Sequence, residues 1–240
     1  MEFQPYRVQG TEYRNVIARF GPETPERIVI GAHYDTAGPL PGADDNGSGV
    51  AGLLELATLL GQKPPPMRVE LVGFTLEEPP YFRTEHMGSR VHAKALRQAG
   101  VKVRAMLSLE TMGFFTDAPD SQKYPVAQLR WRYPSTGNFI AVVGQMSDGD
   151  LVREIATAMR AARPLAVEFL SAPASLEGVD FSDHASYQAE GYPAVMITDT
   201  AFFRNPRYHK PADTWDTLDY GRMALVVQGV HCAVQALSRP

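Results

Sequence analysis

The sequence has one cysteine, no long apolar run and no block of charge of one sign, and each shortage excludes a class of protein. Cys232 is the only cysteine among 240 residues, so neither an intrachain disulfide nor a zinc site built on thiolates can form. The 23 Lys and Arg residues are interspersed with 27 Asp and Glu residues, so no polybasic run indicates a nucleic-acid partner. No apolar run approaches the length of a membrane span, so no membrane partner is expected.

The N-terminus, residues 1–5, lacks the basic and apolar segments that form an export signal. As written, the chain is therefore expected to be cytoplasmic. Because the chain enters a strand almost at once, the alternative is that Met1 begins a truncated chain. In that case the full protein would be secreted or periplasmic.

The sequence does contain enough apolar residues to build a large core. Hydrophobic residues make up 44% of the chain, and 240 residues fit one α/β domain better than two small ones. Apolar runs predict strands, and apolar residues spaced three and four apart predict helices. The predicted strands are 13–20, 27–32, 68–76, 103–109, 138–144, 165–170 and 193–198, and the predicted helices are 50–60, 87–99, 148–162 and 220–237.

Residues 31–51 place a polar loop between a buried strand and a helix, which is where α/β folds hold ligands. His33 would lie at the strand end, and Asp45 just before the glycines that lead into the helix. An imidazole with carboxylate oxygens suits zinc, and Asp35 is spaced to accept the proton of the other imidazole nitrogen. The alternative is a polar, glycine-rich surface loop, but the flanking strand and helix favour a metal site.

Glu77 and Glu78 follow another buried strand and precede Pro79-Pro80. Adjacent glutamates at a strand end place two carboxylates near one point but aim them differently, so one can bind a metal while the other transfers protons. Such a pair is ordinary on an exposed helix. The strand before it and the prolines after it argue against a helix here.

Residues 33–35, followed by the stretch GADDNGSG at 42–49, resemble the metal loop of the M28 family of zinc aminopeptidases. In that family the histidine binds one zinc, and the second aspartate of the Asp-Asp pair bridges two zinc ions. The resemblance implies that His33 is a zinc ligand and that Asp45 is the bridge. It also implies that the first glutamate of the Glu-Glu pair is the general base and that the second is a zinc ligand.

Three more stretches match the family in the same order. Glu110 lies three residues before a glycine, where the family places an acidic zinc ligand that is more often Asp. Tyr208-His209, followed four residues after the histidine by Asp213, resembles the final family signature, in which the histidine is a zinc ligand. Asp183 lies in a Ser-Asp-His tripeptide that lines the family's active site. Tyr208 is predicted to donate a hydrogen bond to an oxyanion.

Three aspartates, Asp35, Asp183 and Asp213, are therefore predicted to orient the residues that bind metal. His184 is expected to make structural hydrogen bonds at a helix start. Phe202 and Phe203 precede the last signature, and they either line a substrate pocket or anchor their loop in the core.

The resemblance covers residues 15–220 and implies a single α/β domain with a mostly parallel central β-sheet flanked by helices on both faces. The domain is expected to cover residues 1–240. One zinc would be held by His33, Asp45 and Glu110, and the other by Asp45, Glu78 and His209. The cofactors would be two Zn²⁺ ions per chain, bridged by Asp45.

The implied activity is that of a metal-dependent aminopeptidase acting on peptides with a free N-terminus, with Glu77 as the general base. Two alternatives stay open. A glutaminyl-peptide cyclase shares this fold but uses one zinc and expels ammonia, and some relatives are non-catalytic binding modules. The complete loop at 42–49 and the Tyr208-His209 pair favour the peptidase over the cyclase. The chain also keeps all five ligand positions and the base, which argues against a binding module.

Overall fold

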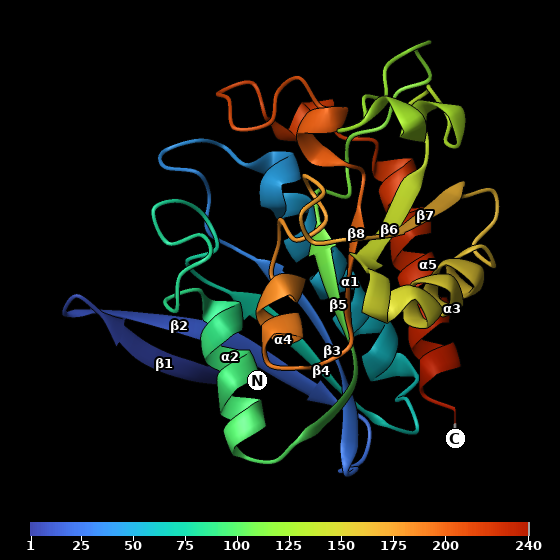
Figure 1. Cartoon of the computed structure of the whole chain (residues 1–240). Helices are drawn as coiled ribbons and strands as arrows, with labels where there is room; N and C mark the ends of the chain where they lie inside the picture. Colours follow the sequence, from blue (N-terminus) through green and yellow to red (C-terminus); the bar gives the residue numbers. More distant parts are fainter. Residues whose placement is uncertain (240) are drawn as a thin grey trace.

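The apolar runs of the sequence form eight strands of one sheet, which crosses the centre of the molecule (Figure 1). The structure is a computed structural model that describes residues 1–239. The strands are β1 (Glu2–Val8), β2 (Thr11–Phe20), β3 (Glu26–His33), β4 (Arg68–Phe74), β5 (Lys102–Glu110), β6 (Ile140–Gln145), β7 (Val167–Ala172) and β8 (Ala194–Thr198). Their order across the sheet is β1-β2-β4-β3-β5-β8-β6-β7.

The four central strands, β4, β3, β5 and β8, are parallel neighbours. Their side chains are mostly apolar and buried on both faces, as is usual for parallel strands. β1 and β2 extend the sheet on one side as an antiparallel pair, and β6 and β7 extend it on the other, with β6 antiparallel to β8. The predicted α/β fold with a mostly parallel central sheet is therefore confirmed.

Five α-helices of the described chain cover the two faces of the sheet (Figure 1). The core on one face includes Leu56, Ile155 and Val230 from the first, third and fifth helices, and the core on the other face includes Leu96 and Tyr187 from the second and fourth. These helices are α1 (Gly49–Gln62), α2 (Gly88–Gln98), α3 (Gly149–Met159), α4 (His184–Ala189) and α5 (Tyr220–Leu237).

The predicted strands and helices are all present, with ends that shift by a few residues, and both ends of α5 agree. The strand β1 was not predicted, because Pro5 interrupts its pattern. β1 lies at the edge of the sheet, where a residue without a backbone N–H is tolerated. Gly21-Pro22 lies in the link from β2 to β3, but β4 lies between these two strands in the sheet, so they form no hairpin.

A charged group, the carboxylate of Glu70, is buried in the sheet. Glu70 on β4 has no exposed side-chain area, and its Oε1 atom accepts hydrogen bonds from Arg19 Nε at 2.7 Å and Arg27 Nη1 at 2.6 Å. Two arginines thus balance one carboxylate inside the protein, which is the arrangement that makes such a burial tolerable.

The parallel central strands bring the polar strand ends together. The carboxyl ends of β3, β4, β5 and β8 lie at the same edge of the sheet, where α/β folds place their ligand sites. His33 ends β3, Glu110 ends β5, and Glu77 and Glu78 follow β4. Within residues 1–239, no helix combines the length and the apolar character needed to cross a membrane.

Candidate metal centre

The loop between β3 and α1 is fixed by hydrogen bonds to the neighbouring strand end. Asn46 Nδ2 donates to Leu109 O at 2.8 Å, and Asp44 Oδ1 accepts from Gly113 N at 2.9 Å. Gly42 has a left-handed backbone with φ of 58°, and a Cβ atom there would lie 2.5 Å from Asp45 O. Only glycine fits this position without strain. The loop therefore presents the buried carboxylate of Asp45 to the strand ends.

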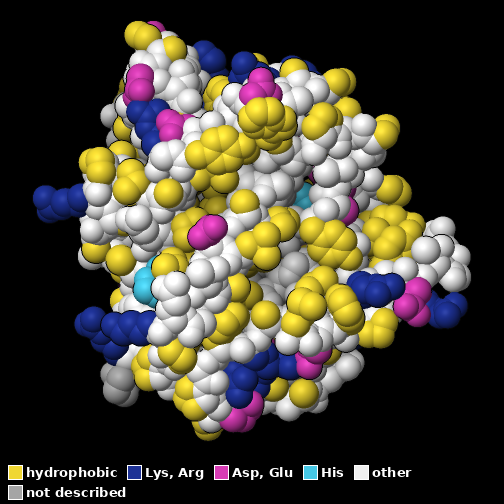
Figure 2. Space-filling view, turned by 180° about the vertical axis from the view of Figure 1, so that it is seen from behind, with side chains coloured by type: hydrophobic (Ala, Val, Ile, Leu, Met, Phe, Trp, Pro, Cys, Tyr) yellow, Lys and Arg dark blue, Asp and Glu magenta, His cyan; other side chains and the backbone are white. Residues whose placement is uncertain are grey.

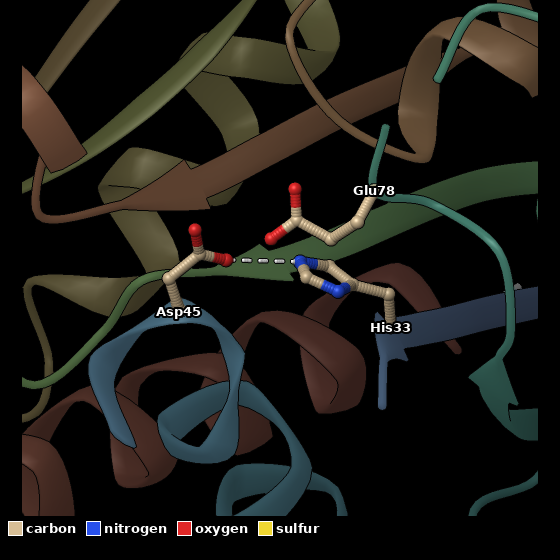
Figure 3. Close-up of side chains that lie close together, drawn as sticks. All are labelled: His33, Asp45 and Glu78. Carbon is tan, nitrogen blue, oxygen red and sulfur yellow. Dashed lines mark ion pairs between the residues drawn. The ribbon is translucent and has the colours of Figure 1, made fainter. Parts of the chain in front are cut away.

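Each oxygen of Asp45 faces a different histidine. Asp45 Oδ1 lies 3.2 Å from His33 Nε2, and Asp45 Oδ2 lies 2.9 Å from His209 Nε2. Figure 3 shows His33 projecting from the end of β3 towards Asp45, with the carboxylate of Glu78 pointing into the same space. One carboxylate thus lies between two imidazoles that are far apart in the sequence.

Each histidine also faces a second carboxylate. Glu110 Oε2 lies 3.4 Å from His33 Nε2, and Glu78 Oε1 lies 3.2 Å from His209 Nε2. The side chains therefore form two groups that share Asp45, one with His33 and Glu110 and the other with Glu78 and His209. These are the two ligand sets that the family resemblance implies.

The chemistry of these groups fits a divalent metal. Ligand atoms of His33, Asp45 and Glu78 all lie within 4.8 Å of one another. Within the described chain, Asp45 Oδ2 and Glu78 Oε1 are buried and make no hydrogen bond, although a ring nitrogen of His209 lies close to each. Buried carboxylate oxygens without donors are costly unless a cation satisfies them.

The carboxylates make the centre attractive to positive charge. The adjacent carboxylate of Asp45, followed by that of Glu78, raises the pKa of His209 to about 10. Burial would lower the pKa of His33, but the nearby Glu110 and Glu77 carboxylates raise it well above its ordinary value. Both imidazoles thus respond to an excess of negative charge, which bound cations would also balance.

Glu77 lies beside the two groups but farther from the imidazole. Its Oε2 atom is 3.9 Å from His33 Nε2, and the side chain is buried. Burial, strengthened by the nearby Glu110 carboxylate and opposed by His33, raises the pKa of Glu77 well above its ordinary value. A buried carboxyl with a raised pKa is suited to proton transfer near neutral pH.

Asp35 acts on different atoms from those predicted. His33 Nδ1 lies 3.1 Å from the main-chain oxygen of Asp35 and 3.7 Å from its carboxylate, so the carbonyl receives the hydrogen bond. The carboxylate instead accepts from Glu77 N at 3.2 Å and Glu78 N at 3.0 Å. Asp35 therefore orients the histidine through its backbone and both glutamates through its side chain, because the loop turns the carboxylate towards β4.

The carboxylate of Asp213 is hydrogen-bonded, whereas that of Asp183 is not. The Asp213 carboxylate accepts from Asp44 N and Asp45 N at 3.1–3.2 Å, and so supports the backbone of the shared aspartate. Asp183 is fully buried, but neither of its carboxylate oxygens makes a hydrogen bond within residues 1–239. The contact predicted to orient a ligand is thus absent for Asp183, and burial raises its pKa to about 7.

Ser182, which sequence analysis did not select, orients a candidate ligand, the role that was predicted for its neighbour Asp183. Its Oγ atom donates to Glu110 Oε2 at 2.7 Å. The Ser-Asp-His tripeptide pointed to this part of the chain, but the family resemblance drew attention to Asp183 and not to Ser182. Asn205 was also missed, and its side chain donates to Asp44 Oδ2 at 2.8 Å.

The remaining histidines lie outside the centre. His184 Nε2 donates to Val179 O at 2.8 Å, which confirms the predicted structural role. His92 Nδ1 lies 2.6 Å from the Tyr187 hydroxyl on the face covered by α2 and α4. His86 packs against Tyr81, and His231 lies within α5.

An apolar pocket opens next to the centre. Glu110 and Tyr208 line it at the side of the centre, and Tyr208 stacks on His209 with ring centroids 4.0 Å apart. Phe202 and Phe203 line the same pocket, and Phe202 is 39% exposed. Of the two alternatives for these phenylalanines, a pocket wall fits better than a core anchor.

Two comparisons of the sequence point the same way. A family model described as Peptidase family M28 matches residues 15–232. The uncharacterized protein YfbL of Escherichia coli K12 is 47% identical over 235 residues, which cover 95% of this chain and 72% of that protein. The probable leucine aminopeptidase 1 of Trichophyton verrucosum is 27% identical over 222 residues, covering 87% of this chain and 54% of that protein. This chain spans about half the length of the leucine aminopeptidases it matches.

Solved structures show the same fold. The aminopeptidase from Aneurinibacillus sp. strain AM-1 matches with a TM-score of 0.70 and 26% identity, over 95% of this chain and 49% of that one. A glutaminyl cyclase from Bacteroides thetaiotaomicron, bound to N-acetylhistamine, matches with a TM-score of 0.70 and 20% identity, over 98% of this chain and 83% of that one. At that identity, the likeness to the cyclase is one of fold alone.

Proposed function

Because this chain belongs to peptidase family M28, we propose that it is a zinc-dependent aminopeptidase that removes residues from the N-termini of peptides. The observation that carries the proposal is the pair of ligand groups that share Asp45, with one histidine at each carboxylate oxygen. Residues 1–240 would form one peptidase domain.

The residues present fit two zinc ions. His33, Asp45 and Glu110 would hold one ion, and Asp45, Glu78 and His209 the other. When bound, the two ions would supply an activated water and positive charge next to the scissile carbonyl.

The protein's own groups would then move the proton. Glu77 would accept a proton from the attacking water and return it to the leaving amine, and its backbone is held in place by Asp35. Tyr208 lines the same pocket as Glu110, and its hydroxyl would donate a hydrogen bond to the developing oxyanion. Ser182 would keep Glu110 aimed at the centre through its 2.7 Å hydrogen bond.

The substrate would be a peptide with a free α-amino group, since the buried carboxylates favour a positive charge beside the scissile bond. No nucleic-acid partner is proposed. Charged side chains of both signs are interspersed on the face shown in Figure 2, where no broad basic patch is visible.

The experiment that tests this function compares matched substrates. The protein, supplied with zinc, should release leucine from leucyl-alanine, and α-N-acetylation of that dipeptide should lower kcat/KM by at least about 100-fold, because the blocked amine has lost its charge and much of its access to the site. Equal rates on both substrates would point to a different hydrolase. Release of ammonia from an N-terminal glutamine, without release of amino acid, would identify a cyclase. No turnover at all, with zinc bound, would identify a binding module.

A further inference from the structure

The pocket beside the candidate metal centre has a floor built by four neighbouring strands. Glu110 on β5 pairs with Thr198 on β8, which pairs with Ala141 on β6, which pairs with Glu168 on β7. Directly paired residues point to the same face of a sheet, and all four line the pocket. A straight row thus runs from Glu110 to Glu168 over three strand spacings, or roughly 14 Å.

The space above this row is mainly apolar. A second row, two residues along each strand, contributes Met196, Val143 and Leu170 to the pocket. Phe181 and Phe202 also line the pocket, and their rings pack against each other. The walls therefore suit a methylene chain, and they extend farther from the centre than a leucine side chain reaches.

The far end of the row carries a carboxylate, that of Glu168, which forms no ion pair within the described residues. Glu168 is half-buried, and its carboxylate makes no hydrogen bond within residues 1–239, although the guanidiniums of Arg160 and Arg132 are near enough to attract it. The guanidinium of nearby Arg160 is occupied, since it donates to Val167 O at 2.8 Å and packs over the Phe169 ring. Lys123, which also lines the pocket, donates to Asp120 O.

Two aromatic rings lie beside this carboxylate. Tyr124 and Tyr133 line the pocket and stack with their centroids 6.2 Å apart. The Tyr133 hydroxyl donates to Phe169 O on β7, which keeps the ring next to Glu168. A carboxylate beside aromatic rings forms a site for an organic cation, because both attract positive charge and the rings accept a flat group.

We propose that Glu168 selects peptides whose N-terminal residue is basic, with arginine preferred over lysine. The proposal rests on the proposed aminopeptidase function, because the substrate's α-carbon must lie beside Glu110 for its side chain to follow the row. The methylene stem would contact the apolar floor, and the guanidinium would reach Glu168 and the tyrosine rings. Arginine is favoured because its planar group can both stack and form two parallel hydrogen bonds to a carboxylate.

Citrulline provides the matched substrate, since it has the shape of arginine without the charge. The value of kcat/KM for arginyl-anilide should exceed that for citrullyl-anilide by about 10- to 100-fold, which is the usual size of a charge-assisted hydrogen bond. In Glu168→Gln this ratio should fall to near one. Glu154→Gln, which removes the same charge from an exposed position on α3, should keep the wild-type ratio.

Three outcomes would overturn the proposal. They are a wild-type ratio near one, an unchanged ratio in Glu168→Gln, and an equal loss in Glu177→Gln, which removes the other unassigned carboxylate of the pocket. If a variant fails to fold, the same preference can be tested in the wild type by competition. Free arginine should then inhibit the cleavage of leucyl-anilide more strongly than free citrulline does. If leucyl-anilide is cleaved but arginine has no advantage, the specificity proposal fails and the aminopeptidase stands. If neither anilide is cleaved, the proposed function itself fails.

Discussion

Replacing Glu77 with glutamine is expected to stop turnover while the zinc content stays that of the wild type. The Glu77 carboxylate is 3.9 Å from the nearest imidazole nitrogen, whereas the proposed ligand oxygens lie 2.9–3.4 Å from theirs. Glutamine preserves the size of the side chain and the backbone hydrogen bond to Asp35, but it cannot accept the proton. Losing a general base lowers kcat by about 10²- to 10⁴-fold, which corresponds to roughly 3 to 5 kcal/mol of barrier.

The adjacent Glu78 provides a matched control for this substitution. Glu78→Gln makes the same chemical change one residue away, but it removes an oxygen that lies 3.2 Å from His209 Nε2. It should lower zinc affinity and lose activity in parallel, and excess zinc should restore part of that activity. Zinc per chain after dialysis and kcat on leucyl-anilide should be measured for both variants. A Glu77→Gln protein that keeps most of its kcat, or that loses zinc as Glu78→Gln does, would refute these assignments.

Three further substitutions test the surroundings of the centre and the core. Asp35→Ala should lower both zinc affinity and kcat/KM by about 10- to 100-fold in dialysis and anilide assays, because it frees the backbone of both glutamates. Glu70→Ala should lower the free energy of unfolding by about 3 kcal/mol in urea, since two arginines lose their buried partner. Burial lowers the pKa of His184 to about 4 in the folded chain, whereas in the unfolded chain this histidine has its ordinary pKa of about 6.5. As the pH falls below about 6.5, the unfolded chain therefore binds a proton at this histidine before the folded chain does, and the folded chain loses stability. The stability advantage of metal-free wild type over His184→Gln should therefore be full at pH 7 and about 2 kcal/mol smaller at pH 5, and an advantage that grows on acidification would contradict this.

The sequence identifies the helices, the strands and most of the candidate metal centre, because three of the strands are followed or ended by residue types that bind metals or transfer protons. The apolar runs before His33, Glu77 and Glu110 mark three strands, and parallel strands bring their carboxyl ends to one edge. Residues that are far apart in the chain can therefore be predicted to lie together at this edge, even when the strand order is not known. Asp45 could be singled out because the glycines after it lead into α1.

What the sequence could not provide depends on contacts between distant segments. Which atom of Asp35 meets His33 is decided by how the loop turns against β4, and that turn is not visible in a motif. Ser182 reaches Glu110 only because α4 packs beside β5. The row from Glu110 to Glu168 exists because β8 and β6 lie between β5 and β7 in a fixed register, which local patterns do not determine.

The shared role of Asp45 is the central claim, and the zinc count tests it most directly. Metal-free protein should be titrated with zinc by calorimetry, with the bound metal confirmed by elemental analysis, for wild type, His33→Ala and His209→Ala. Each histidine lies within 3.2 Å of a different oxygen of Asp45, so each variant should lose one ion and keep the other. The account predicts two ions per wild-type chain and one per chain in each variant. A single ion in the wild type, or two ions remaining in either variant, would contradict it.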